Sequence, residues 1–309
     1  MTTAPGPAPR LDLDRLVAID VHAHVEISAD GHPSLSAELE AGKTAYFRAD
    51  RGQFGIDEMA AYYRERAMAA VVFTVDAETA TAHPPISNQE IAEGCARHPD
   101  VLIPFASLDP HKGRAAVRQA RRLVTEHGVR GFKFHPSLQA FWPSDRLAYP
   151  LYEALTELGV PALFHSGQTG IGAGVRGGGG IRLKYANPME LDDVAADFPD
   201  LTIICAHPSV PWQDEALAVA THKPNVYIDL SGWSPKYFPP QLVRQANSIL
   251  AHKVLFGSDF PVITPDRWLR DFAQLEIKDE VRPMILKENA VRVLGLEGAS
   301  AGAGARRQR

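Results

Sequence analysis

The residues of this chain that could do chemistry begin with two histidines at the end of a short apolar segment. His22 and His24 follow residues 17–21, which are apolar apart from Asp20, a pattern typical of a buried strand. Side chains two positions apart on a strand point to the same side, so both imidazoles can aim at one point. Imidazole is the commonest protein ligand of transition metals, so the pair suggests part of a metal site. For Asp20 we expect a structural hydrogen bond and not a metal bond.

Further polar side chains stand at the ends of other apolar segments. A catalytic metal needs about three or four protein ligands and an open position for water or substrate. His165 and Asp259 each end a predicted strand, and with the histidine pair they complete such a set. A metal lowers the pKa of bound water toward ~7, and Asp259 could accept the proton. His207, at the end of another segment, could polarise a substrate carbonyl or shuttle a proton.

The segment 129–135 brings a lysine and another histidine to the same region. Lys133 has three interpretations: a carbamate that bridges two metals, a group that binds a substrate carboxylate, or the partner of a carboxylate inside the fold. We favour the last two. His135 precedes a proline and is expected to line the site.

A glycine-rich loop follows His165. It runs from 167 to 185, contains four consecutive glycines, and lacks the Gly-Lys-Ser/Thr ending of a phosphate-binding loop. Two interpretations stay open: a flexible flap, or a lid hinged at its glycines whose cations contact an anionic substrate. The candidate substrate-binding cations are Arg176, Arg182 and Lys184, and the candidate aromatic wall consists of Trp142, Trp233 and Tyr237.

These side chains require a fold that brings strand ends together. Short apolar segments alternate with helical patterns, and there are no hairpin signals. The predicted strands are 17–21, 71–75, 101–107, 129–135, 160–165, 201–206, 226–230 and 253–257. This order predicts an α/β fold, a (β/α)8 TIM barrel in which a parallel eight-stranded sheet carries outer helices and active sites lie at the carboxyl ends of the strands. The alternative is an open doubly wound sheet, but its glycine motif is absent. Residues 25–55 show little periodicity and are predicted to be a loop.

Length and composition fit one barrel. The 309 residues are 45% hydrophobic and 22% charged, which is ordinary for a soluble globular protein. The net charge of −5 argues against nucleic-acid binding, and no run reaches the ~18 apolar residues of a membrane span. We predict a single barrel over 11–296 between disordered segments at 1–10 and 297–309. Cys95 and Cys205 are expected to be reduced, which fits a cytoplasmic location.

Together these motifs resemble the amidohydrolase superfamily, and most of all its branch that includes aminocarboxymuconate semialdehyde decarboxylase and related metal-dependent hydrolases. The segments that carry the resemblance are 20–24, 131–136, 164–167, 206–208 and 257–261. It implies one divalent ion, usually zinc or manganese, and a dimer is common among similar proteins. The ligands that it implies are His22, His24, His165 and Asp259, with His207 as the catalytic histidine. The second histidine pair of binuclear members and the decarboxylases' region after the fourth strand have no match here.

Three functions follow. The first is a metal-dependent hydrolase in which activated water attacks a carbonyl of a small anionic, aromatic or unsaturated substrate. Related barrels also cleave carbon–carbon bonds by hydrolysis, including those of β-ketoacyl-CoA esters. The second is a metal-dependent decarboxylase of an aromatic or muconate-type acid, in which proton delivery to carbon replaces attack by water. The third is a metal-free binding protein or a lactonase. We expect zinc as the metal, with manganese or another ion as the alternative, and neither nucleic acid nor membrane as a partner.

Overall fold

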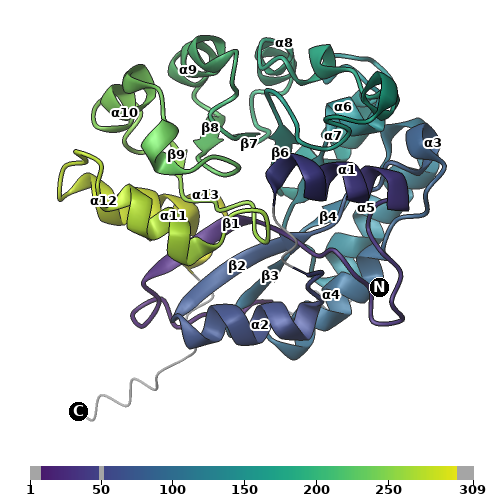
Figure 1. The fold of residues 1–309 in the computed structure, drawn as a ribbon, viewed down its shortest axis with the longest axis horizontal. Helices are drawn as coiled ribbons and strands as arrows, with labels where there is room; N and C mark the ends of the chain where they lie inside the picture. Colours follow the sequence, from purple (N-terminus) through teal and green to yellow (C-terminus); the bar gives the residue numbers. More distant parts are fainter. Residues whose placement is uncertain (1–7, 49–51, 298–309) are drawn as a thin grey trace.

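The structure is a computed structural model that describes residues 8–48 and 52–297. In this part of the chain, short parallel strands surround a central axis and helices cover their outer side (Figure 1). The strands are β1 (Ala18–His24), β2 (Met68–Phe73), β3 (Leu102–Pro104), β4 (Ala106–Ser107), β5 (Phe132–Phe134), β6 (Ala162–His165), β7 (Ile203–Ala206), β8 (Val226–Asp229) and β9 (Val254–Leu255). Each of the eight predicted segments overlaps at least one of them, and segment 101–107 contains both β3 and β4.

The strands join in sequence order into a closed ring. One parallel sheet has the order β1-β2-β3, and a second runs from β4 to β9. β3 and β4 belong to one extended segment interrupted at Phe105, so this segment links the two sheets. The ring closes where the Val21 N–H donates to the carbonyl of Phe256 (3.0 Å) and the Asp259 N–H donates to the carbonyl of His22 (2.9 Å). The predicted (β/α)8 barrel is confirmed.

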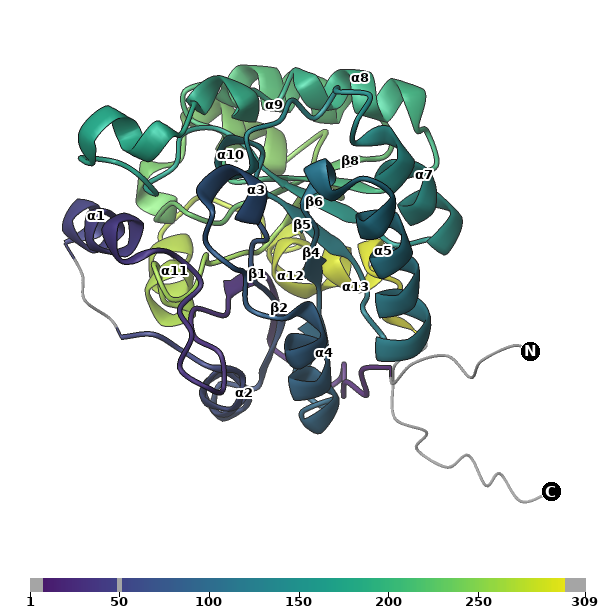
Figure 2. The same cartoon turned by 90° about the vertical axis from the view of Figure 1, so that its right-hand side faces the viewer.

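The helices form the outer layer, and Figure 2 shows several of them side-on. Their caps follow the sequence: the Ser87 hydroxyl accepts the Glu90 N–H at the start of α4, and Gly128 ends α5 in the left-handed conformation. The α-helices are α1 (Ala37–Phe47), α2 (Ile56–Glu65), α3 (Glu78–Thr81), α4 (Asn88–Arg97), α5 (Arg114–His127), α6 (Pro136–Gln139), α7 (Tyr149–Leu158), α8 (Glu190–Asp197), α9 (Gln213–His222), α10 (Pro240–Ala246), α11 (Pro265–Phe272), α12 (Val281–Pro283) and α13 (Asn289–Val293). Short helical turns are η1 (Pro110–Lys112), η2 (Arg176–Gly180), η3 (Leu183–Ala186), η4 (Pro235–Tyr237) and the π-helical η5 (Met284–Glu288).

Helix α1 corrects one prediction, because residues 25–55 were expected to be a loop. The helix has no apolar stripe, and Leu39 is its one buried residue. Its packing partner is the glycine-rich loop: a Cβ added at Gly42 would lie 2.5 Å from Cγ2 of Val175. The helix is thus supported by a tertiary contact that periodicity does not reveal. Residues 49–51 lie outside the described residues.

Alternate strand residues pack on opposite sides of the ring. Ile19 and Val21 belong to the apolar cluster inside the barrel, whereas Ala18 and Ala23 belong to the cluster between strands and helices. The change of side between Val21 and Ala23 coincides with a shift in the β1–β2 pairing between Asp20 and Ala23. Such an irregularity re-aims side chains, and here it turns the histidines that follow Val21 toward the barrel axis.

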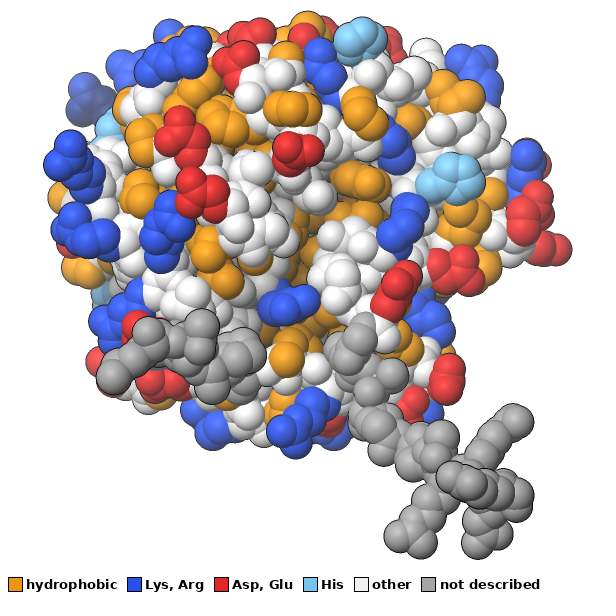
Figure 3. Space-filling model, turned by 180° about the vertical axis from the view of Figure 1, so that it is seen from behind, with side chains coloured by type: hydrophobic (Ala, Val, Ile, Leu, Met, Phe, Trp, Pro, Cys, Tyr) orange, Lys and Arg blue, Asp and Glu red, His pale blue; other side chains and the backbone are white. Residues whose placement is uncertain are grey.

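The surface mixes both charges. In Figure 3 acidic and basic side chains are interspersed over the face seen from behind, with hydrophobic side chains between them. Within the described ranges no helix is long and apolar enough to cross a membrane. Cys95 and Cys205 are both free and buried, as expected for reduced thiols. The predicted disordered segments lie outside the described residues, apart from residues 8–10 and 297.

Candidate active site

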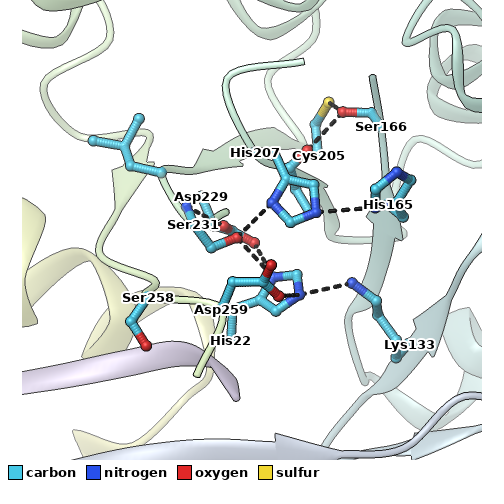
Figure 4. Close-up of polar contacts among 12 residues, drawn as sticks. His22, Lys133, His165, Ser166, Cys205, His207, Asp229, Ser231, Ser258 and Asp259 are labelled. Carbon is cyan, nitrogen blue, oxygen red and sulfur yellow. Dashed lines mark hydrogen bonds and ion pairs between the residues drawn. The ribbon is translucent and has the colours of Figure 1, made fainter. Parts of the chain in front are cut away.

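A pocket of about 820 Å³ opens at the carboxyl ends of the strands, where the fold predicts an active site. Its walls come from the loop after β1, from helix α1, from the glycine-rich loop after β6 and from the segments after β8 and β9. Seven of the predicted site residues line it: His24, Lys133, His135, His165, His207, Trp233 and Asp259. Figure 4 shows how several of these side chains converge.

Three of the four predicted metal ligands meet at one point. His22 Nε2 lies 3.2 Å from His24 Nε2 and 3.3 Å from Asp259 Oδ1. His24 Nε2 lies 3.1 Å from the same carboxylate oxygen. Burial would raise the pKa of Asp259, but the hydrogen bond to His24 and the neighbouring imidazoles hold it below its usual range, so this carboxylate is ionised. A pair of imidazole nitrogens and a carboxylate oxygen this close form a donor set that fits a divalent metal.

The orientation of His22 is set by Asp229, a residue that the sequence analysis missed. Asp229 Oδ2 lies 2.9 Å from His22 Nδ1, and both side chains are fully buried. Burial, followed by the charge of Lys133, lowers the pKa of His22 to about 3, so its imidazole is neutral. The Nδ1–H therefore donates to Asp229 and the Nε2 lone pair faces the ligand group, as in metal sites whose histidines are held by a carboxylate. The sequence could have indicated Asp229, because it lies near the end of the predicted strand 226–230.

His165, the fourth predicted ligand, lies beside His207 and is not part of the three-residue group. Its Nδ1 is 2.9 Å from His207 Nε2, and its ring stacks on His135 with centroids 3.9 Å apart. Its Nε2 is buried without a hydrogen-bond partner among the described residues. Because buried polar atoms are nearly always paired, this nitrogen is an available contact for a metal or a substrate.

His207 is fixed by a serine that the sequence analysis also missed. Ser231 Oγ lies 2.9 Å from His207 Nδ1 and 2.9 Å from His22 Nδ1, so one hydroxyl links the ligand group to the predicted catalytic histidine. His207 and Asp259 both have positive φ, 72° and 68°. Such backbone conformations in residues other than glycine cluster at functional sites.

Lys133 lines the pocket and points at the ligand group (Figure 4). Its Nζ lies 3.0 Å from His22 Nε2, and burial lowers its pKa to about 8, against the opposing charges of Asp229 and Asp259. No salt bridge joins it to a carboxylate within the described ranges, although the charges of Asp229 and Asp259 favour its protonated form, so the interpretation of Lys133 as an ion-pair partner stays a prediction. Its position fits the interpretation as a substrate-binding lysine. His135 lines the pocket as expected and caps α6 by accepting the Leu138 N–H (3.3 Å).

Among the remaining candidates, Trp233 lines the pocket. Five others are not part of its lining: Trp142, Arg176, Arg182, Lys184 and Tyr237. Trp142 instead packs on Tyr185, with Lys184 Nζ 5.1 Å above its ring, and Tyr237 is 61% exposed. Both arginines are exposed.

The run of four glycines after Arg176 contains a left-handed turn. Gly177, Gly178 and Gly179 have φ values of 60–65° and form a tight left-handed turn. Other residues would pay roughly 1–2 kcal/mol each in this conformation. The glycines therefore serve a defined turn shape in this structure.

Two further charged residues line the pocket, Glu26 and Lys43. The sequence could have indicated Glu26, because it continues the alternation of His22 and His24. It could not have indicated Lys43, because Lys43 lies on helix α1, which was not predicted.

The amidohydrolase family profile matches residues 19–296. This chain belongs to the amidohydrolase family. The resemblance to the superfamily is thereby confirmed, and the chain is an enzyme. A comparison with curated proteins gives no match.

Solved structures with the same fold include both reaction classes. An uncharacterized TIM-barrel protein from Bordetella bronchiseptica has a TM-score of 0.73 and 22% identity, over 91% of this chain and 99% of that one. A dihydroxybenzoic acid decarboxylase from a Polaromonas species, solved with manganese and 2-nitroresorcinol, has a TM-score of 0.63 and 19% identity over 91% and 97%. A probable 2-pyrone-4,6-dicarboxylic acid hydrolase from Acinetobacter baumannii has a TM-score of 0.59 and 16% identity over 90% and 99%. These likenesses show the fold.

Proposed function

We propose that this amidohydrolase is a divalent-metal-dependent hydrolase that adds water to a carbonyl of a small anionic substrate. The observation that carries the proposal is the convergence of His22 Nε2, His24 Nε2 and Asp259 Oδ1 within 4.8 Å of one another beside the pocket. A divalent ion held there supplies Lewis acidity toward the carbonyl and makes water more acidic. We propose zinc, with manganese as the alternative, and His165 as a further ligand.

Each of the surrounding side chains has a separate role in the proposed reaction. Asp259, ionised at neutral pH, accepts the proton of the attacking water and returns it to the leaving group. His207 donates a hydrogen bond from Nε2 to the substrate carbonyl in place of its contact with His165 Nδ1, and Ser231 holds its ring through Nδ1. Lys133 binds the anionic group of the substrate, and Trp233 offers an apolar face to an aromatic or unsaturated part. Because the loop cations lie outside the lining, we propose a small anion and not a β-ketoacyl-CoA ester.

The proposal is tested with a substrate found by screening lactones, amides and carboxylated aromatics. Turnover in H₂¹⁸O should place ¹⁸O in the product. Asp259→Ala should lose turnover by roughly 10³-fold or more while circular dichroism stays unchanged. An active Asp259→Ala enzyme without bound metal would contradict the scheme.

The second candidate is a metal-dependent decarboxylase. The observation that favours it is the fold shared with the dihydroxybenzoic acid decarboxylase, together with a buried lysine beside the ligand group. Release of CO₂ and incorporation of solvent deuterium at carbon, without ¹⁸O in the product, would favour this candidate. Elemental analysis that finds no stoichiometric metal would instead favour a metal-free lactonase or binding protein. A cytoplasmic location and a homodimer stay predictions.

A further inference from the structure

Helix α1 forms one wall of the pocket and is locked onto the glycine-rich loop. Lys43 and Phe47, both on α1, line the pocket. A Cβ added at Gly170 would lie 2.5 Å from the Phe47 ring, and one at Gly179 would lie 2.8 Å from Cδ2 of Leu39. These close approaches, together with that of Gly42, hold the helix at a defined distance from the site.

The charged group on this wall is a lysine between two carboxylates. Lys43 Nζ bonds Glu26 Oε1 and lies 3.0 Å from Glu40 Oε1. All three side chains are at least three-quarters buried, with exposures of 12%, 7% and 25%. Burial acts against the charge of Lys43, but the two carboxylates raise its pKa, so it is a cation. The group of Glu26, Lys43 and Glu40, here called the α1 wall, holds two carboxylates and one ammonium, a formal net charge of −1.

Lys133, the other lysine that lines the pocket, has different neighbours from Lys43. Lys133 has no carboxylate within ion-pair distance in the described part of the chain, and its nearest partner is the imidazole of His22. Lys133 is therefore available to a substrate anion, whereas Lys43 is already paired with two carboxylates. A second anionic group near α1 would meet net negative charge in a site of reduced dielectric, where like charges repel strongly.

We propose that the α1 wall determines specificity, so that the pocket accepts monocarboxylates with a hydroxyl or another neutral hydrogen-bond donor and rejects dicarboxylates. The carboxylate of Glu26 accepts the hydrogen bond of that donor, and Lys43 holds Glu26 in place. This inference rests on the proposed function only in assigning the substrate's anionic group to Lys133.

The test is calorimetric binding of four probes to the enzyme as purified, which requires no turnover. The probes are 3- and 4-hydroxybenzoate and their dicarboxylate counterparts, isophthalate and terephthalate. The wild-type enzyme should bind the hydroxybenzoates at least about tenfold more tightly. Equal or tighter binding of the dicarboxylates would overturn the proposal, and so would failure of the wild type to bind any of the four probes. The ¹⁸O and CO₂ experiments are independent of this result, so either idea can fail alone.

Two variants that change the charge of the α1 wall in opposite directions test whether the wall determines specificity or only supports the structure. Glu26→Gln should strengthen dicarboxylate binding about tenfold and weaken hydroxybenzoate binding, because the wall becomes neutral. Lys43→Gln should weaken dicarboxylate binding further. Glu38→Gln, an exposed residue on the same helix, is the matched control and should change neither ratio. If both variants lower all four affinities alike, the wall is structural and the proposal is wrong.

Discussion

Asp229 Oδ2 accepts the Nδ1–H of His22 at 2.9 Å, although the two residues are 207 positions apart in the chain. The contact joins the carboxyl ends of β8 and β1, two strands that have β9 between them. Burial would raise the pKa of Asp229, but His22 outweighs it and holds the pKa below its usual range. A buried carboxylate on the far nitrogen fixes the tautomer that a metal requires on the near one.

The first prediction concerns that contact. In Asp229→Asn the amide can donate to His22 Nδ1, which moves the imidazole proton to Nε2 and removes a lone pair from the ligand group. We expect metal affinity to fall by roughly 10–100-fold, with the fold retained. The measurement is competition with a chelator, monitored by elemental analysis.

The matched control for Asp229→Asn is Asp193→Asn on the exposed side of α8, which should keep wild-type metal affinity. An Asp229→Asn enzyme that holds its metal as tightly as the wild type would show that the carboxylate does not position His22.

The second prediction concerns His207. His207→Gln keeps a polar side chain near Ser231 but removes the imidazole from the pocket. Turnover should fall by roughly 10²–10³-fold, as for loss of a hydrogen-bond donor to the reacting carbonyl, while metal content stays unchanged. Equal losses of metal and activity would instead indicate that His207 is a ligand.

The sequence predicted the barrel because β-branched apolar segments and their polar ends follow simple periods. His24, Lys133 and Asp259 were found by the rule that active sites lie at strand ends. The same rule applied to β8 would have found Asp229. Lys43 could not be found, because α1 has no apolar stripe and depends on contacts with a loop far along the chain.

The directions of loop side chains were also not predictable from the sequence. Trp142 and the cations of the glycine-rich loop follow strand ends in sequence, but sequence distance from a strand does not give the direction of a loop side chain. The loop turns at Gly177–Gly179, and its cations Arg176, Arg182 and Lys184 are exposed. The sequence alone therefore could not show which of these residues reach the pocket.

The third prediction concerns pH and Lys133. Its folded pKa of about 8 lies below the unfolded value of 10.5, so the native state binds this proton less tightly. The resulting penalty is present below pH 8 and disappears as pH rises toward 10.5. Lys133→Met should thus stabilise the chelator-treated protein by about 3 kcal/mol at pH 7, with a smaller gain at pH 9.5. The measurement is urea unfolding at both pH values, and a gain that does not shrink with pH would contradict the assignment.

The last prediction separates backbone strain from displacement of His207. Gly232 has φ +74°, and a Cβ there would lie 2.6 Å from His207 Nδ1. Gly159 has φ +65° with nothing within 4 Å of an added Cβ. Both Gly→Ala changes should cost roughly 1–2 kcal/mol of stability because both force alanine into the left-handed region. Only Gly232→Ala should also lower kcat, by about tenfold or more, since its methyl group must push the His207 ring away from Ser231. Thermal unfolding and steady-state kinetics on the two variants check this, and equal kcat values would show that the position of the His207 ring does not limit the reaction.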